Sequence, residues 1–273
     1  MSSATSEKPK PYTLGRTEGG KFPDFGNLFS ATLGEFVDHL GDYVMLGLGQ
    51  MLIVFPAAFF LIFLLYGGIT VLILGGVMGS GALGALVAEG AGDDTGALVM
   101  LGGTALTALA TIAAFFALIL GFAALLAPVG ASVTRAIARH QRGEGKLTFQ
   151  DAFATYTQDL LSVFAIAAIL VTGTLVGLCF CYLPGLAFGM LLSMAPPMVY
   201  LHRQPAMTAF RVSLRDLTAN AGWYLQFAVI YFAVAMIASY VPILGPMFLT
   251  SLHVRAYRER FGDADEPLLD AAT

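Results

Sequence analysis

Residues 43–66 read YVMLGLGQMLIVFPAAFFLIFLLY, an apolar run that contains no Asp, Glu, Lys or Arg and that decides the fold. An α-helix needs about 20 such residues to cross the roughly 30 Å hydrocarbon core of a bilayer. Of all 273 residues, 57% are hydrophobic and only 12% are charged, whereas soluble proteins carry about 25% charged residues. The sequence therefore predicts an integral membrane protein.

Long uncharged stretches recur along the chain, and turn signals at Pro184-Gly185 and at Pro242 to Pro246 divide the last two of them. The predicted fold is all-α and polytopic, with six transmembrane helices and interfacial amphipathic helices. The expected spans lie near residues 43–66, 104–127, 160–182, 186–202, 222–241 and 245–258. We expect a polar tail at 1–24, a single six-span membrane domain at 25–260 and an acidic tail at 261–273.

All fourteen Lys and Arg residues fall in segments that six spans would place on one side of the membrane. The opposite loops carry only Glu89, Asp93 and Asp94 as charges. The positive-inside rule therefore predicts both termini in the cytoplasm. No apolar segment precedes residue 43, so no cleavable signal peptide is expected. The net charge of −4 argues against a nucleic-acid partner.

The first hairpin is unusually long, because residues 43–88 and 97–134 both lack charge. As straight helices at 1.5 Å per residue, both would exceed the bilayer core. Two spans in the first stretch would reverse the sidedness of everything downstream, so residues 67–103 must tilt, re-enter or project. Gly75 and Gly79 are predicted to pack tightly, on the returning segment or on a second subunit.

A threefold internal repeat is the simplest account of a recurring spacing. Apolar residues stand at positions i, i+4 and i+11 before three of the spans. These sets are Phe25, Phe29 and Phe36; Phe149, Phe153 and Leu160; and Ala206, Phe210 and Leu217. The pairs Ala127-Pro128, Ala195-Pro196 and Gly245-Pro246 close the three units.

Four short motifs resemble a broad group of six-span prokaryotic membrane proteins, which includes the membrane domain attached to some glycerophosphodiester phosphodiesterases. The motifs are Asp151-Ala152-Phe153, Tyr182-Leu183-Pro184-Gly185, Ala209-Phe210 to Ser213, and Ala256-Tyr257-Arg258. The resemblance covers roughly residues 120–260. It implies a fold but no catalytic residue, since no soluble phosphodiesterase domain is present.

Three patterns that often carry chemistry are not expected to do so here. Gly15 to Phe22 has P-loop spacing, but Phe22 replaces the Ser or Thr that holds magnesium. Cys179 and Cys181 point about 200° apart on a helix and cannot ligate one metal together. The four histidines, at 39, 140, 202 and 253, are spread along the predicted cytoplasmic margin. We expect no metal site, no cofactor and no catalytic residue.

Polar groups in or beside the spans are few, and Gln50 and Gln226 are predicted to bridge helices. Tyr231 and Asn220 are the other members of this set. A second group is basic and is expected to contact lipid phosphates or a partner at the cytoplasmic rim. It comprises Arg135, Arg139, Arg142, Arg203 and Arg211. Simple orientation by the positive-inside rule is the alternative for these arginines.

These features lead us to expect a non-enzymatic membrane protein that organises or assists a membrane partner or lipid. Its expected partners are membrane lipids and either a second copy or another membrane protein. The alternative is a small-solute or lipid transporter, because internal repeats and proline-broken spans recur in transporters. An intramembrane enzyme is disfavoured, since the sequence offers no nucleophile–base pair or metal cluster.

Overall fold

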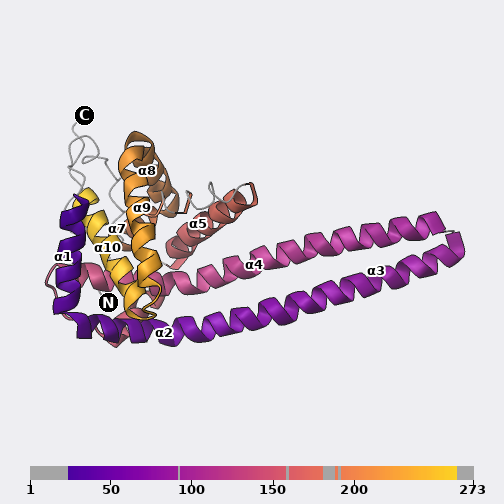
Figure 1. Ribbon diagram of the computed structural model, residues 1–273, viewed down its shortest axis with the longest axis horizontal. Helices are drawn as coiled ribbons and strands as arrows, with labels where there is room; N and C mark the ends of the chain where they lie inside the picture. The colour runs from indigo at the N-terminus through magenta and orange to yellow at the C-terminus, as the bar shows by residue number, and fades with distance from the viewer. Residues whose placement is uncertain (1–23, 92, 158–159, 181–187, 190–191, 263–273) are drawn as a thin grey trace, which may run out of the picture. The chain divides into compact units, whose positions relative to one another are not determined.

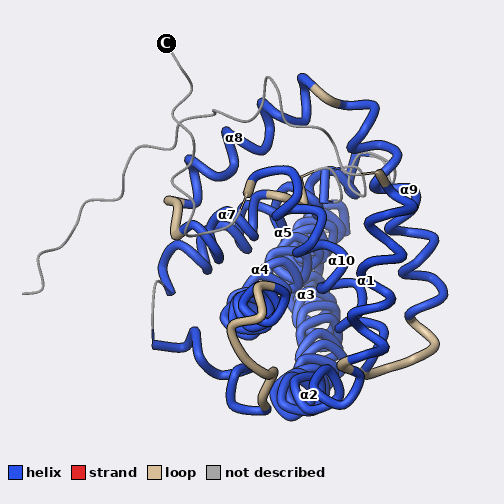
Figure 2. Tube along the Cα trace, turned by 90° about the vertical axis from the view of Figure 1, so that its left-hand side faces the viewer, coloured by secondary structure: helices blue, strands red, loops and turns tan. Residues whose placement is uncertain are grey.

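The computed structural model describes residues 24–91, 93–157, 160–180, 188–189 and 192–262. Throughout these residues the protein is helical, with no strand (Figure 2). The first half contains α1 (Phe25–Asp38), α2 (Leu40–Phe63), the π-helical turn η1 (Leu64–Gly68), α3 (Ile69–Ala91) and α4 (Asp93–Gln141). The second half contains the 3₁₀ segment η2 (Phe149–Thr157), α5 (Leu160–Phe180), α7 (Ala195–His202), α8 (Ala206–Ala219), α9 (Ala221–Ala238) and α10 (Leu244–Phe261) (Figure 1).

The chain divides into two compact units. The bundle unit consists of Met1–Ile53 and Leu126–Thr273, and the hairpin unit consists of Val54–Leu125. Both boundaries fall inside helices, in α2 and in α4, and each lies within three residues of a helix-interior proline, Pro56 or Pro128. Proline removes a helical hydrogen bond, so both helices are weakened next to the boundary.

Four helical stretches are long and apolar enough to cross a membrane, as expected for a membrane protein. They are Leu40–Gly90, Asp94–Gln141, Leu160–Gly177 and Ala221–Ala238. The predicted spans at 186–202 and 245–258 are not among them. Within the described residues, α7 has only eight residues, and the last turns of α10 carry charged side chains.

The amphipathic helices of the predicted repeat differ in form. α1 and α8 are both 14-residue α-helices, whereas the corresponding residues 149–157 form the 3₁₀ helix η2. α1 begins at an N-cap, because the Asp24 carboxylate accepts a hydrogen bond from the Asn27 backbone N–H at 3.0 Å. The threefold repeat therefore stays a prediction.

In the hairpin unit, α3 runs beside the first part of α4 (Figure 1). A Cβ atom added at Gly76 or Gly103 would collide with Thr107 or Ser80 across this contact, and one at Gly84 would lie 3.0 Å from the Gly96 carbonyl oxygen. A Cβ at Gly75 or Gly79 would meet no atom within 4 Å, which corrects the packing predicted for them on the returning segment. Their packing on a second subunit stays a prediction. A stripe at Gly76, Ser80 and Gly84 makes the contact instead.

The bundle unit contains the buried core. Its main cluster brings together residues of α5, α7, α8, α9 and α10, such as Val163, Met198, Tyr224, Leu252 and Tyr257, each at most 2% exposed. A second cluster packs the start of α2 against the end of α4 through Tyr43, Leu46 and Ile137. Burial in these clusters positions the polar groups described next.

Candidate functional site

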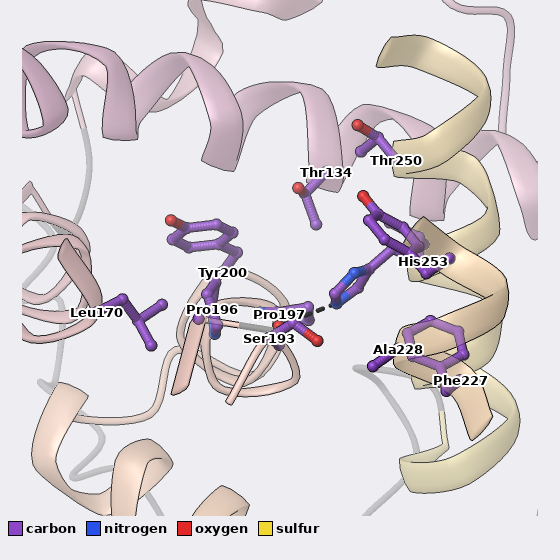
Figure 3. A pocket seen from close by; sticks show the side chains of 13 residues that line it. Thr134, Leu170, Ser193, Pro196, Pro197, Tyr200, Phe227, Ala228, Thr250 and His253 are labelled. Carbon is purple, nitrogen blue, oxygen red and sulfur yellow. Dashed lines mark hydrogen bonds between the residues drawn. The ribbon is translucent and has the colours of Figure 1, made fainter. Parts of the chain in front are cut away.

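A cavity of about 370 Å³ lies within the bundle unit, lined by residues of α4, α5, α7, α9 and α10 (Figure 3). Leu170, Phe227 and Val254 are among the apolar residues of its lining. Its polar groups are Thr134, Ser193, Tyr200, Tyr231, Thr250 and His253. The cavity therefore combines apolar surface with hydroxyl groups and one imidazole.

Local sequence explains how α7 reaches the cavity. Pro196 and Pro197 stand in the first turn of α7, where proline is tolerated because the N–H groups of that turn have no helical partner. Both prolines line the cavity. At the other end of α7, the Arg135 Nε donates to the Tyr200 carbonyl oxygen at 2.6 Å and so anchors α7 to α4.

The imidazole of His253 is held from several sides. Its Nε2 lies 2.9 Å from the carbonyl oxygen of Ser193, which can only accept, so Nε2 carries the proton. The rings of Phe227 and Tyr231 pack edge-to-face with the imidazole, at centroid distances of 6.0 and 5.9 Å. Trp223 stacks on Phe227 at 5.2 Å. These contacts give the imidazole a defined orientation beside the cavity.

The geometry does not form a Ser–His catalytic pair. His253 contacts the backbone carbonyl of Ser193, while Ser193 Oγ is buried and has no hydrogen-bond partner in the described part of the chain. Nucleophilic catalysis needs the hydroxyl and the base within hydrogen-bond reach. The Ser193 hydroxyl is instead a group that a bound molecule could satisfy.

The five predicted contact arginines differ in their surroundings. Arg135 binds Tyr200 as described, Arg139 pairs with Asp151 at 2.8 Å, and Arg142 pairs with Glu144 at 2.6 Å. Arg203 and Arg211 are exposed. Arg203 ends α7 with a left-handed backbone (φ 52°). Lipid or partner contact by these arginines stays a prediction.

Gln50 and Gln226 were predicted to bridge helices, but the hydrogen bonds between helices are made by other residues. Gln226 is exposed on α9 and Gln50 is half-buried, and the described residues give neither side chain a hydrogen bond. The bridge comes from Ser251 of α10, whose Oγ lies 3.1 Å from the Tyr43 hydroxyl and 2.9 Å from Gln141 Nε2. Gln141 is the last residue of α4, close to Arg139 and Arg142. A further polar residue among these arginines does not indicate a contact between helices.

A buried polar cluster in the bundle unit was missed from the sequence. The Asp216 carboxylate accepts hydrogen bonds from Asn220 Nδ2 at 2.9 Å and from the Tyr224 hydroxyl at 2.6 Å, and it pairs with Arg260. The spacing of Asp216, Asn220 and Tyr224, at i, i+4 and i+8, is a signal that could have revealed it. Sequence reasoning instead treated Arg260 only as an orienting charge.

Two of the four histidines, His39 and His140, lie side by side, which corrects the predicted spread for this pair. The rings of His39 and His140 pack edge-to-face with centroids 4.6 Å apart. His202 Nδ1 lies 2.7 Å from the Tyr257 hydroxyl, and His253 lines the cavity. His39 and His140 are brought together because the last turn of α4 lies beside the junction between α1 and α2.

Several predictions fall outside the described residues. These are the P-loop-like Gly15 to Phe22, the motif Tyr182 to Gly185, Cys181, the side chain of Cys179, most of the N-terminal tail 1–24 and all but the first two residues of the acidic tail 261–273.

Comparison with protein-family models, with curated proteins and with solved structures found no match. The resemblance to six-span prokaryotic membrane proteins therefore stays a prediction. The chemistry of the cavity is the basis on which we argue function.

Proposed function

We propose that this chain is a non-enzymatic integral membrane protein that binds a lipid-like amphiphile in the cavity of its bundle unit. The observation that carries the proposal is the lining of the cavity. It joins apolar and aromatic surface to five hydroxyl groups and an imidazole, and none of the described residues that line it is Asp, Glu, Lys or Arg. Binding pockets for small molecules are typically apolar with a few polar groups that fix the ligand's orientation, so a cavity of this composition is the first place to expect a ligand.

Size and polarity define the ligand class. Ligand pockets hold about 300–1,000 Å³, so a cavity of about 370 Å³ suits a small amphiphile or one segment of a larger lipid. Burial of apolar ligand surface contributes about 25 cal/mol per Å². The hydroxyls of Tyr200 and Ser193 would meet the polar end, and Leu170 and Phe227 the apolar part.

A charged ligand fits less well. An ion taken into an apolar cavity loses hydration, which is costly unless a charge pairs with it. Among the lining residues that the structure describes, no side chain carries a fixed opposite charge. Three of the helices that contribute to the cavity, α4, α5 and α9, contain candidate membrane spans. A neutral ligand could therefore enter from the bilayer.

Native mass spectrometry tests lipid binding directly. The full chain is purified in mild detergent and the mass of any retained lipid is recorded. Ala228 lines the cavity, whereas Ala233 of the same helix is exposed. We expect Ala228→Phe to lose the lipid adduct and the matched control Ala233→Phe to retain it. An adduct of equal occupancy on both variants, or none on the natural chain, contradicts the proposal.

One observation favours the alternative of a transporter. His253 is an ionisable group at the cavity, and it faces the turn before the Pro196-Pro197 pair. Proton relays in transporters use such groups. The test of transport is uptake into proteoliposomes. A panel of small solutes is supplied under an imposed proton or sodium gradient, and the amount of each solute taken up is measured. Gradient-dependent uptake that disappears in His253→Gln, Gln50→Ala or Gln226→Ala would replace the binding proposal with transport.

We also propose the finer membrane arrangement. It comprises six spans, three related units, and both termini in the cytoplasm of a prokaryotic inner membrane. The distribution of all fourteen Lys and Arg residues supports it. The two further spans, 186–202 and 245–258, are the ones that this charge distribution requires. Expected partners are membrane lipids and a second copy or another membrane protein.

A further inference from the structure

We infer that His39, Asp42 and His140 form a binding site for a divalent transition-metal ion of the zinc class. One ligand atom from each of the three side chains lies within 4.8 Å of the other two. All three residues belong to the bundle unit. The inference is independent of the cavity, from which these residues are absent.

The backbone fixes two of the ligands relative to each other. His39 is the C-cap of α1, and its N–H donates to the Glu35 carbonyl oxygen at 3.1 Å. The Asp42 N–H donates in turn to the His39 carbonyl oxygen at 3.0 Å. This turn holds the imidazole and the carboxylate three residues apart on the junction between α1 and α2.

His140 has the hydrogen bonding of a metal ligand. Its Nδ1 lies 2.9 Å from the Gly145 carbonyl oxygen, which only accepts, so Nδ1 carries the proton. Nε2 is then the nitrogen with a free lone pair, and it is buried without a partner in the described structure. The residue is only 9% exposed. Metal-bound histidines usually donate their other ring N–H to a carbonyl or carboxylate.

The ligand set favours zinc over calcium or magnesium. Two imidazoles and one carboxylate match open zinc sites, in which water takes the fourth position, whereas calcium and magnesium prefer oxygen alone. Ligands of a tetrahedral zinc lie roughly 3.3 Å apart at bond lengths of about 2.05 Å. The separations of up to 4.8 Å must therefore shorten by as much as about 1.5 Å on binding, and the exposed side chain of His39 is free to move toward the ion.

A metal at this point would join segments distant in sequence. His140 stands in the last turn of α4, where the helix dipole also favours a cation. The ion would thus fasten the α1–α2 junction to the end of α4. Because the ligands come together only in the folded bundle unit, binding would stabilise that unit.

The test uses the full chain, purified in detergent with an affinity tag that contains no histidine and then treated with a chelator. Zinc sulfate is titrated while thermal unfolding is followed, and bound zinc is measured after gel filtration. We expect one zinc per chain and a saturable rise in unfolding temperature. Cobalt(II) should give the visible absorption of a tetrahedral nitrogen–oxygen site, which a purely structural role of these residues would not produce.

Matched variants assign the ligands. Loss of an outer-shell partner typically weakens metal affinity about 10–100-fold, so His140→Gln and Asp42→Asn should weaken zinc binding by roughly 100-fold or more. Asp38→Asn, an exposed acid of the same region, should leave it unchanged. Zinc binding that survives His140→Gln, or a natural chain that binds no stoichiometric zinc and gives no cobalt spectrum, overturns the inference.

Discussion

Arg260 Nη2 lies 2.7 Å from Asp216 Oδ1, and the two side chains are 1% and 0% exposed. The pair joins the last turn of α10 to α8. Tyr224 and Asn220 satisfy the remaining carboxylate lone pairs. A buried ion pair whose hydrogen bonds are complete is costly to break from one side, because the remaining charge has no partner.

Removal of one partner should therefore destabilise the protein strongly. We expect Asp216→Asn or Arg260→Met to lower the free energy of unfolding by about 3–5 kcal/mol. The double variant Asp216→Asn/Arg260→Met should lose less than the sum of the single effects. Thermal and denaturant unfolding in detergent measure this. Arg215→Met, at an exposed neighbouring position, is the control, and a single variant as stable as this control would refute the expectation.

The second prediction concerns pH and Asp151. Burial acts to raise the pKa of this carboxyl group, but hydrogen bonds from Thr148 and the Arg139 guanidinium outweigh burial and hold its pKa below the ordinary 3.8. A lowered pKa contributes stability that is complete above the unfolded-state pKa and is lost as pH falls through the folded-state value.

The stability difference between the natural chain and Asp151→Asn should thus be constant above about pH 5 and shrink below about pH 4. Unfolding temperatures recorded across this range measure it. Glu144→Gln removes an acid of the same loop that is 45% exposed and should show little change. A difference that grows as pH falls would contradict the predicted sign.

The third prediction separates neighbouring glycines of the hairpin unit. Gly76→Leu should force α3 away from Thr107 of α4 and destabilise the hairpin by about 1–3 kcal/mol. Gly79→Leu should be tolerated, since a side chain there meets open space. Unfolding temperature and gel-filtration profile in detergent distinguish them. Equal effects of both substitutions would place the contact elsewhere, for example against a second subunit.

The fourth prediction is the orientation in the membrane. In a background without Cys179 and Cys181, a cysteine at position 142 should resist a membrane-impermeant reagent in intact cells and react after permeabilisation. A cysteine at position 94 should react in intact cells. Labelling of position 142 from outside would reject the cytoplasmic assignment.

Local composition was enough to predict the four apolar stretches. The predicted spans at 43–66, 104–127, 160–182 and 222–241 overlap the four helical stretches that are long and apolar enough to cross a membrane. Hydrophobicity is a property of each segment alone, so sequence reports it directly. The two remaining predicted spans came from dividing the last two uncharged stretches at Pro184-Gly185 and at Pro242 to Pro246. The described helices long and apolar enough to cross a membrane do not include them.

Contacts between segments that are distant in the chain could not be predicted from the sequence. His39 and His140 stand about a hundred residues apart, and nothing in either neighbourhood marks the other. The cavity likewise needs α7 and α10 to be placed side by side before His253 has a role. Helix register was a finer difficulty, because the small-residue stripe at Gly76 is one residue away from the predicted Gly75.

The outward-facing surface of the hairpin unit bears on how its sequence can vary between relatives. In both Leu40–Gly90 and Asp94–Gln141, none of the most apolar 18-residue window is buried inside the protein. Leu, Ile, Val, Phe and Met should be interchangeable at the exposed positions of this surface, since the protein does not bury the side chains there. The amino-acid sequence of this segment should diverge rapidly between homologues while its apolar composition is kept. The stripe of Gly76, Ser80 and Gly84 should be conserved, because it makes the contact between α3 and α4.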